Sequence, residues 1–231
     1  MRRLAIIPAR GGSKRIKDKN IVDFLGKPLI AYSLEAVSAS GLFDCVHVST
    51  DSQQIATVSA SLGHPVDFMR PAEMADDLTG LLPVLRWVIS EYDSIGFSFT
   101  SVTCVFPTAP LLLPQDLISA NARFEEFDCL YPLFSFSEYP VPLEWAFRHL
   151  DQGICSPINP DKLSVRSQDL PVAYYETGSF AIYSVDHLKE SSLDFSRTLA
   201  HFLPRHRSID IDTPSDLEFA KRLYSSLMTC S

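Results

Sequence analysis

The sequence lacks the motifs of several common catalytic and metal-binding sites. Its five cysteines are scattered without a C-x-x-C pair, so neither a zinc site nor a disulfide framework is expected. The six histidines show no metal-ligand spacing, and no G-x-S-x-G motif is present, which disfavours covalent hydrolase chemistry. The absence of G-x-x-x-x-G-K-S/T and of G-x-G-x-x-G excludes the phosphate loop of ATPases and the dinucleotide-binding fingerprint.

Long apolar runs and an excess of positive charge are also missing. No apolar run approaches the about 18 residues of a membrane-spanning helix, and the start of the chain turns polar too soon for a signal peptide. We therefore expect a cytoplasmic protein without membrane contact. The net charge of −8, from 20 Lys and Arg against 28 Asp and Glu, argues against a nucleic-acid partner. A length of 231 residues with 46% hydrophobic residues predicts one globular domain of ordinary size.

Positive charge is nevertheless concentrated in one loop near the N-terminus. A short apolar strand at residues 4–7 leads into this loop, which holds two glycines and Ser13. Its five cationic side chains are Arg10, Lys14, Arg15, Lys17 and Lys19. Glycines let backbone N–H groups approach an anion closely, and the cations can neutralise several negative charges together. Because open α/β sheets bind ligands where their strands end, the loop predicts a polyphosphate site rather than a solvated cluster.

The rest of the chain alternates between strand-like and helix-like patterns. Short apolar runs predict strands at residues 4–7, 46–49, 66–69, 102–106, 180–184 and 206–211. Helical spacing links the apolar residues of segments 30–37, 55–62, 81–92 and 117–128, and of the segment after Pro214. This order predicts βαβ units in one mainly parallel sheet with helices on both faces. Right-handed crossovers would bring residues 10–20, 50–51, 70–77 and 106–110 to one edge.

The alternation breaks between residues 131 and 175. This stretch is rich in proline and aromatic residues and shows no clean period. We interpret it as an insertion, an interaction arm or a lid rather than as more of the core.

Two carboxylates near the C-terminus form a candidate metal site. Asp210 and Asp212 are expected to close the strand at 206–211, where residues two apart point to the same side. Mg²⁺ binds one or two carboxylates and shares its other positions between water and substrate phosphates. The alternative is that Asp212 or Thr213 caps the helix after Pro214 while Asp210 is solvated. A nearby polyphosphate loop favours the metal, because the metal neutralises phosphate charge. The interpretation requires that the basic loop and this pair converge on one magnesium-bound triphosphate.

Two further polar groups are candidates for substrate binding. Asp76 and Asp77 follow Arg70, and a carboxylate can accept a hydrogen bond from an exocyclic amine such as N4 of cytosine. A binding role is favoured for Asp76, whereas Asp77 either binds or caps the helix near Thr79. The second group contains Arg166 and Gln168, followed by Tyr174, Tyr175 and Glu176. An arginine can hold a carboxylate with two hydrogen bonds, and tyrosines can stack on a sugar face.

Taken in order, six segments resemble the acylneuraminate cytidylyltransferase family. They are I-I-P-A-R-G-G-S-K-R-I-x-x-K-N-I, V-S-T-D, M-R-P-x-E, D-D-x-T-G, P-T-A-P and D-I-D-T, and they span nearly the whole chain. D-D-L-T-G-L-L-P-V at 76–84 and R-S-Q-D-L at 166–170 are most similar to the pseudaminic acid branch. The resemblance implies a three-layer, Rossmann-like α/β nucleotidyltransferase fold with a mainly parallel sheet. It further implies a single domain over 1–231 with a dimerisation arm inserted at about 131–175, and hence a homodimer.

The same resemblance implies a reaction and a set of site residues. CMP is transferred from CTP to the anomeric hydroxyl of a nine-carbon acidic keto-sugar, with Mg²⁺ bound and pyrophosphate released. Implied catalytic residues are Arg10, Lys14 and Asp212, with Lys14 on the pyrophosphate side. Implied nucleotide-binding residues are Pro8, Ala9, Arg10, Gly11, Gly12, Ser13, Lys14, Lys19, Asn20, Arg70 and Asp76. Implied sugar-side residues are Thr108, Arg166, Gln168, Tyr174, Glu176 and Phe180, and the implied metal ligands are Asp210 and Asp212.

The choice of sugar stays open at this point. The chain has A-Y-Y-E-T-G-S-F at 173–180 where the pseudaminic branch has an A-Y-H-D-A-G-Q-F-like segment, so Tyr175, Glu176 and Ser179 depart from it. Phe106 and Tyr175 stand where sialic acid enzymes more often carry Gln and Arg, which argues against N-acetylneuraminic acid. The alternatives are a sialic, legionaminic or KDO-type acid, or a nucleotide-sugar glycosyltransferase, whose D-x-D motif should lie mid-chain.

Overall fold

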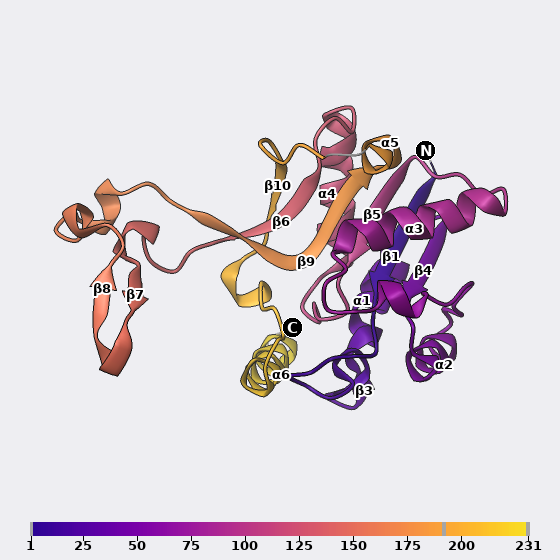
Figure 1. Ribbon diagram of the computed structural model, residues 1–231, viewed down its shortest axis with the longest axis horizontal. Coiled ribbons are helices and arrows are strands. Elements are labelled where there is room, and N and C mark those ends of the chain that lie inside the picture. The colour runs from indigo at the N-terminus through magenta and orange to yellow at the C-terminus, as the bar shows by residue number, and fades with distance from the viewer. Residues whose placement is uncertain (1, 191–192, 230–231) are drawn as a thin grey trace.

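The computed structural model describes residues 2–190 and 193–229 and is built around one six-stranded sheet (Figure 1). The strand order is β10-β6-β9-β5-β1-β4. The strands are β1 (Arg3–Pro8), β4 (Cys45–Ser49), β5 (Ser101–Val105), β6 (Leu133–Glu138), β9 (Tyr174–Ser184) and β10 (Leu199–Phe202). β1 is parallel to β4 and β5, β10 is parallel to β6, and β9 runs antiparallel to both of its neighbours. The expected α/β fold with a mainly parallel sheet is therefore confirmed.

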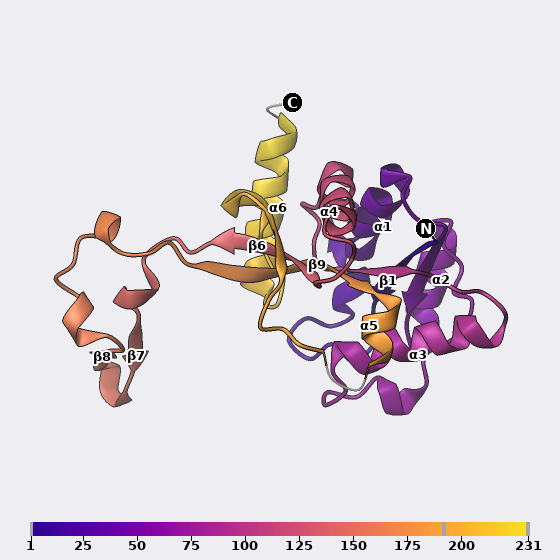
Figure 2. The ribbon, with the colours of Figure 1, turned by 90° about the horizontal axis from the view of Figure 1, so that it is seen from above.

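Helices cover both faces of this sheet. They are α1 (Leu29–Ser40), α2 (Gln53–Ser61), α3 (Leu81–Ser94), α4 (Pro114–Glu126) and α5 (Val185–Lys189). The last helix, α6 (Pro214–Thr229), packs instead in a separate cluster with Phe24, Leu29 and Tyr32. Ala5 and Ile7 of β1 pack into the same core as α1 and α4, whereas Leu4 and Ile6 pack into the core that contains α3 and α5. Because successive side chains of a strand alternate between faces, a strand buried on both sides reads as an unbroken apolar run. Figure 2 shows α1 and α4 on one side of the sheet and α3 and α5 on the other.

Two of the expected strands are wrong. Residues 66–69 follow Pro65 and form no ladder with β4, although the backbone N–H of Arg70 donates to Thr50. Residues 206–211 are not a strand either: β10 ends at Phe202, and Arg205–Arg207 form a 3-10 turn directly after Pro204. Proline cannot donate to a ladder, so it ends the pairing there.

The irregular stretch of the sequence proves to be a projecting segment of residues 139–173, called the arm below (Figures 1 and 2). It contains a small antiparallel hairpin, β7 (Phe147–His149) with β8 (Cys155–Pro157), and several 3-10 turns. Its start was placed too early at 131, because residues 133–138 form β6 inside the sheet. Another small hairpin, β2 (Asp23–Phe24) with β3 (Lys27–Pro28), follows the basic loop.

In the described ranges, no helix combines the length and the apolar character that crossing a bilayer would require.

Candidate active site

The basic loop begins where β1 ends and lies against the end of β4. The backbone N–H of Ala9 donates to Ser49 O at 2.9 Å, and that of Gly11 donates to Asp51 Oδ1 at 2.9 Å. A Cβ on Gly11 would lie 3.0 Å from Ser52 Cβ, a tight contact that a larger residue could make only if Ser52 shifted, so glycine suits this close approach. The buried Asn20 donates to Arg10 O at 3.0 Å and holds the far end of the loop. The start of the loop is therefore tied to the end of β4, and Asn20 closes the loop onto its own beginning.

A pocket of about 480 Å³ opens over this loop. It is lined by Pro8, Arg10, Ser13, Lys14, Arg15, Lys19 and Asn20 of the N-terminal segment and by Asp77, Phe106, Pro107, Thr108 and Asp212. These residues come from the loops after β1 and β5, from the segment before α3 and from the segment before α6. The loops after the strands thus meet at one edge, as the βαβ pattern predicted.

On one side of the pocket, the cations face Asp77. Arg10 Nη1 lies 2.8 Å from Asp77 Oδ1, and Lys14 pairs with Asp77 Oδ2. Arg10 also donates to the backbone oxygen of Asp76 at 2.8 Å. Hydrogen bonds from Lys14 and Arg10 lower the pKa of Asp77 below its ordinary value, which keeps it a carboxylate.

On the other side, the cations face Asp212. Arg15 Nη2 lies 2.7 Å from Asp212 Oδ2, and Lys19 Nζ lies 3.0 Å from Asp212 Oδ1 and 3.0 Å from Ile211 O. Desolvation opposes ionisation of Asp212, but Lys19 and Arg15 outweigh it and lower its pKa. The structure thus brings the basic loop and the C-terminal carboxylates together, as the sequence analysis required.

Asp210 lies beside Thr108, whose Oγ1 is 3.5 Å from Asp210 Oδ1. Desolvation of this carboxyl group and the negative charge of Asp212 raise its pKa, and Lys19 and Thr108 only partly compensate. A bound cation would relieve this repulsion.

The pair Asp210 and Asp212 fits Mg²⁺ by its donor chemistry. The described residues contain no cluster of three or more His, Cys, Asp or Glu side chains suited to a metal. Two carboxylates are nevertheless sufficient where a polyphosphate supplies the remaining oxygens. The expected strand geometry of the pair was wrong, since both residues lie in an irregular segment between Arg207 and α6.

The cap of α6 is provided by other residues. The N–H of Thr213 donates to Asp216 Oδ2 at 2.7 Å, and the N–H of Asp216 reaches Thr213 Oγ1 at 3.3 Å. This reciprocal arrangement is a capping box. Of the two capping residues considered, Thr213 takes the role, and the carboxylate of Asp212 faces the pocket.

The structure gives Asp76 and Asp77 different surroundings. Asp76 Oδ1 accepts hydrogen bonds from the N–H groups of Leu78 at 3.0 Å and Thr79 at 2.6 Å, so this carboxylate closes a turn. It is Asp77 that lines the pocket.

Arg70 is outside the pocket lining and 6% exposed. Its Nε donates to Ser49 Oγ at 3.1 Å and its Nη2 to Ser49 O at 2.7 Å. The structure therefore places Arg70 beneath the site, where it supports the end of β4.

Comparison with known proteins identifies the family to which the chain belongs. Residues 4–229 match the family model described as "Cytidylyltransferase". The chain belongs to the cytidylyltransferase family. It is 39% identical over 225 residues to a pseudaminic acid cytidylyltransferase of Campylobacter jejuni serotype O:2, covering 97% of both chains. It is 31% identical to a CMP-N,N'-diacetyllegionaminic acid synthase of Legionella pneumophila, covering 96% of both.

The fold of this cytidylyltransferase also matches solved structures. The structure of a CMP:2-keto-3-deoxy-manno-octonic acid synthetase complexed with CTP superimposes with a TM-score of 0.73. The match covers 98% of this chain and 99% of that chain at 17% sequence identity, so it supports the fold alone. The expected family and nucleotidyltransferase class are thus confirmed, and the chain is an enzyme of that class.

The expected sugar-side residues of the cytidylyltransferase are dispersed. Thr108 lines the pocket. Arg166 and Gln168 lie on the arm, where Arg166 Nε is 2.9 Å from Asp169 Oδ2. Tyr174 lies at the base of the arm with its ring 4.8 Å from that of Phe202.

Glu176 and Phe180 differ in their surroundings, although both belong to β9. Desolvation and the charge of Asp210 raise the pKa of Glu176, which shows that this carboxyl lies near the candidate metal ligands. The expectation for Phe180 was wrong: it is fully buried in the core between the sheet and α4.

Four pocket residues were missing from the expected set: Arg15, Asp77, Phe106 and Pro107. Arg15 was visible as a cation of the basic loop, and Phe106 and Pro107 as the end of an apolar strand. Asp77 was left undecided, because a D-D pair does not show which member closes the turn.

Proposed function

We propose that this cytidylyltransferase transfers CMP from CTP to the anomeric hydroxyl of pseudaminic acid or a close nine-carbon relative, and releases pyrophosphate. The observation that carries the proposal is the contact of Arg15 and Lys19 with Asp212, since it joins a polyphosphate loop to a metal-type carboxylate in one pocket. The 39% identity to a pseudaminic acid cytidylyltransferase, against 31% to a legionaminic acid synthase, favours the first sugar.

The triphosphate of CTP would lie along the basic loop. Arg10, Lys14 and Ser13 line the pocket there and would neutralise and orient the phosphates. The anomeric hydroxyl releases its proton to solvent as its oxygen forms a bond to the α-phosphorus, the bond from the α-phosphorus to the bridging oxygen breaks, and pyrophosphate leaves with the electron pair. Because phosphoryl transfer needs little covalent work from the protein, positioning and charge neutralisation supply the catalysis.

Asp210 and Asp212 would hold Mg²⁺. The ion supplies positive charge to the phosphate oxygens when it is bound. Arg15 and Lys19 then keep Asp212 ionised and oriented, as their contacts with its carboxylate indicate. Since nucleoside triphosphates are made inside the cell, we expect the reaction to occur in the cytoplasm.

We propose a homodimer formed through the arm. Its exposed apolar side chains include Val141, Phe147, Ile154, Ile158 and Val172, each more than half exposed. Apolar side chains gathered on a projecting element are typical of a protein interface. Since Arg166 and Gln168 are remote from the pocket of their own chain, a sugar-binding role for them would act on the site of a second copy.

Tyr175, Glu176 and Ser179, which depart from the pseudaminic pattern, differ in their contacts. Ser179 is buried and bonded to Thr177 at 3.1 Å, and the hydroxyl of Tyr175 lies 3.2 Å from that of Ser208. Glu176 remains near Asp210 and keeps the carboxyl group that Asp supplies in that branch.

Purified enzyme with CTP and Mg²⁺ should be offered a panel of nonulosonic acids, with pyrophosphate release as the readout. We expect the fastest release with pseudaminic acid and none when UTP replaces CTP. Equal rates with legionaminic or N-acetylneuraminic acid would contradict the sugar. Failure with every acid, combined with sugar transfer from a nucleotide-sugar donor, would favour the glycosyltransferase alternative.

A further inference from the structure

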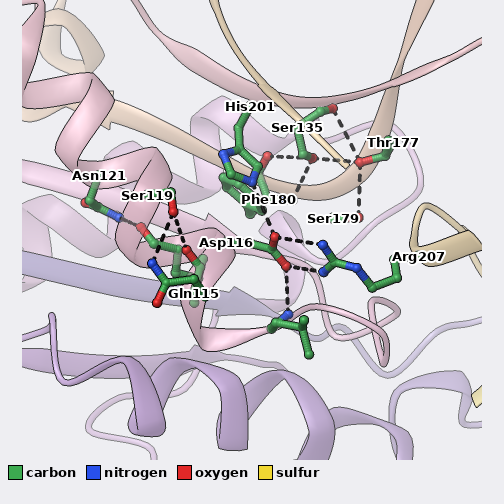
Figure 3. A network of polar contacts seen from close by, with 12 residues as sticks. Gln115, Asp116, Ser119, Asn121, Ser135, Thr177, Ser179, Phe180, His201 and Arg207 are labelled. Carbon is green, nitrogen blue, oxygen red and sulfur yellow. Dashed lines mark hydrogen bonds and ion pairs between the residues drawn. The ribbon is translucent and has the colours of Figure 1, made fainter. Parts of the chain in front are cut away.

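One buried carboxylate ties together two segments that both contribute side chains to the pocket lining, the segment before α4 and the segment before α6. Asp116 is in the first turn of α4 and is 7% exposed. Its Oδ1 lies 3.1 Å from Arg207 Nη2 and 3.4 Å from His201 Nε2. Its Oδ2 accepts from Arg207 Nη1 and, at 2.9 Å, from the N–H of Leu113. Figure 3 shows the fork-like pairing of Arg207 with this carboxylate.

The partners of Asp116 belong to elements that the proposed reaction uses. Arg207 is three residues before Asp210 in the chain. The segment that leads into α4 carries Thr108, which lines the pocket. The same two segments meet again at the pocket, where Thr108 Oγ1 lies 3.5 Å from Asp210 Oδ1.

Asp210 is therefore held between two fixed points. On its C-terminal side, Ile211 is fully buried in an apolar cluster with Phe24 and Leu29. On its N-terminal side, the ion pair of Arg207 with Asp116 fixes the backbone. A two-pronged pair of this kind restricts orientation as well as distance, and it has little access to water.

We propose that Asp116 and Arg207 are positioning residues, which hold the segment of Asp210 and Asp212 in the geometry that binds the metal-nucleotide complex. This inference rests on the assignment of Asp210 and Asp212 to Mg²⁺ in the proposed function. Outer-shell partners that orient metal ligands typically change metal affinity about 10- to 100-fold when they are removed. Neither residue is among those that line the pocket, so we expect the effect to act through Asp210.

A second ion pair on the same helix provides a matched control. Glu125, near the other end of α4, pairs with Arg3 of β1. Both residues are outside the pocket lining. Glu125→Gln removes a partly buried ion pair from α4 without touching the segment of Asp210.

The experiment measures binding of Mn²⁺ to the enzyme with CTP by electron paramagnetic resonance, together with the Mg²⁺ dependence of pyrophosphate release. We expect Asp116→Asn and Arg207→Gln to weaken Mn²⁺ binding about 10-fold or more, with a matching rise in the Mg²⁺ concentration for half-maximal rate. Glu125→Gln should lower the melting temperature but leave both readouts unchanged. CTP binding without metal should change little in all three variants.

Arg207→Lys keeps the charge and one hydrogen bond, so it should fold even if the neutral variants do not. It should show a smaller loss of Mn²⁺ affinity than Arg207→Gln. The positioning role would be overturned if the folded Arg207 and Asp116 variants bound Mn²⁺ as tightly as wild type while Asp210→Asn lost that affinity. Wild-type affinity in Asp210→Asn and Asp212→Asn would instead overturn the metal assignment of the proposed function.

Discussion

The ion pairs of the basic loop and the ion pair of Asp116 differ in how much water reaches them. The side chains of Lys14 and Asp77 are 77% and 43% exposed, whereas the side chains of Arg207 and Asp116 are 16% and 9% exposed. Exposed ion pairs contribute little to stability, so a phosphate can replace a carboxylate there at small cost. A buried pair must stay matched, because a single buried charge is costly. The loop therefore suits ligand exchange, and the Asp116 pair suits a fixed framework.

Removing the ammonium of Lys14 should produce the largest effect on turnover. Lys14→Ala is expected to lower kcat roughly 100- to 1,000-fold, because the loop loses a charge that stabilises the departing pyrophosphate. Stability should hardly change, since the side chain is 77% exposed. Lys17→Ala is the control, because Lys17 is exposed and outside the pocket lining. Steady-state pyrophosphate release measures both, and near-wild-type turnover of Lys14→Ala would remove its assigned role.

Neutralising Asp212 should have the next largest effect. Asp212→Asn is expected to weaken activation by Mg²⁺ about 10- to 100-fold, because a ligand charge is lost and Arg15 and Lys19 lose their partner. Rate against Mg²⁺ concentration provides the measurement. Glu218→Gln on α6 removes an exposed charge of the same sign and should leave the curve unchanged. If the dependence of rate on Mg²⁺ concentration were unaltered in Asp212→Asn, Asp212 would not be a metal ligand.

The buried ion pair of Asp116 with Arg207 should affect how the free energy of unfolding changes at acid pH. Desolvation would raise the pKa of Asp116, but His201 and Arg207 outweigh it and lower the pKa to about 2. An unfolded Asp has a pKa of about 3.9. Ionised Asp116 therefore stabilises the folded state by about 2 kcal/mol above pH 4. This stabilisation is lost as the pH falls towards 2. Urea unfolding at pH 5, 4 and 3 should show a shallower decline for Asp116→Asn than for wild type. Equal declines would contradict the prediction.

Neutralising Asp77 should give the smallest effect of the four, and it should strengthen ligand binding where the other changes weaken function or stability. In Asp77→Asn, Arg10 and Lys14 lose a competing carboxylate, so CTP affinity should rise a few-fold while stability stays unchanged. Isothermal titration with CTP measures this change. Glu73→Gln removes an exposed charge from the same segment and should bind as wild type does. Weaker CTP binding by Asp77→Asn would mean that Asp77 orients the cations instead of competing for them.

Much of the fold and the basic loop of the site could be predicted from the sequence, because both depend on local sequence patterns. The apolar run of β1 and the cations after it identify a strand followed by an anion-binding loop. The position of strand ends at one edge follows from the βαβ order, and it brought Thr108 and the basic loop to one pocket.

The errors arise where tertiary contacts decide. Segment 206–211 resembles a strand, but Pro204 and the burial of Ile211 determine its path. Phe180 belongs to a segment that looked sugar-facing, yet the alternation of β9 directs it into the core. The hydrogen bonds of Arg70 to Ser49 at the end of β4 were likewise not visible in the sequence. None of these contacts leaves a period or a motif in the sequence.

The unbroken course of β9 has a consequence for how this enzyme can be altered. The strand runs from Tyr174 at the base of the arm to Ser184 in the sheet. Between them lies Gly178, at φ +63°, where an added Cβ would come within 3.6 Å of Asp210 Oδ2. One continuous strand therefore connects the arm to the candidate active site. The arm is not a modular attachment, and exchanging it between related enzymes would require the receiving strand to be transplanted with it.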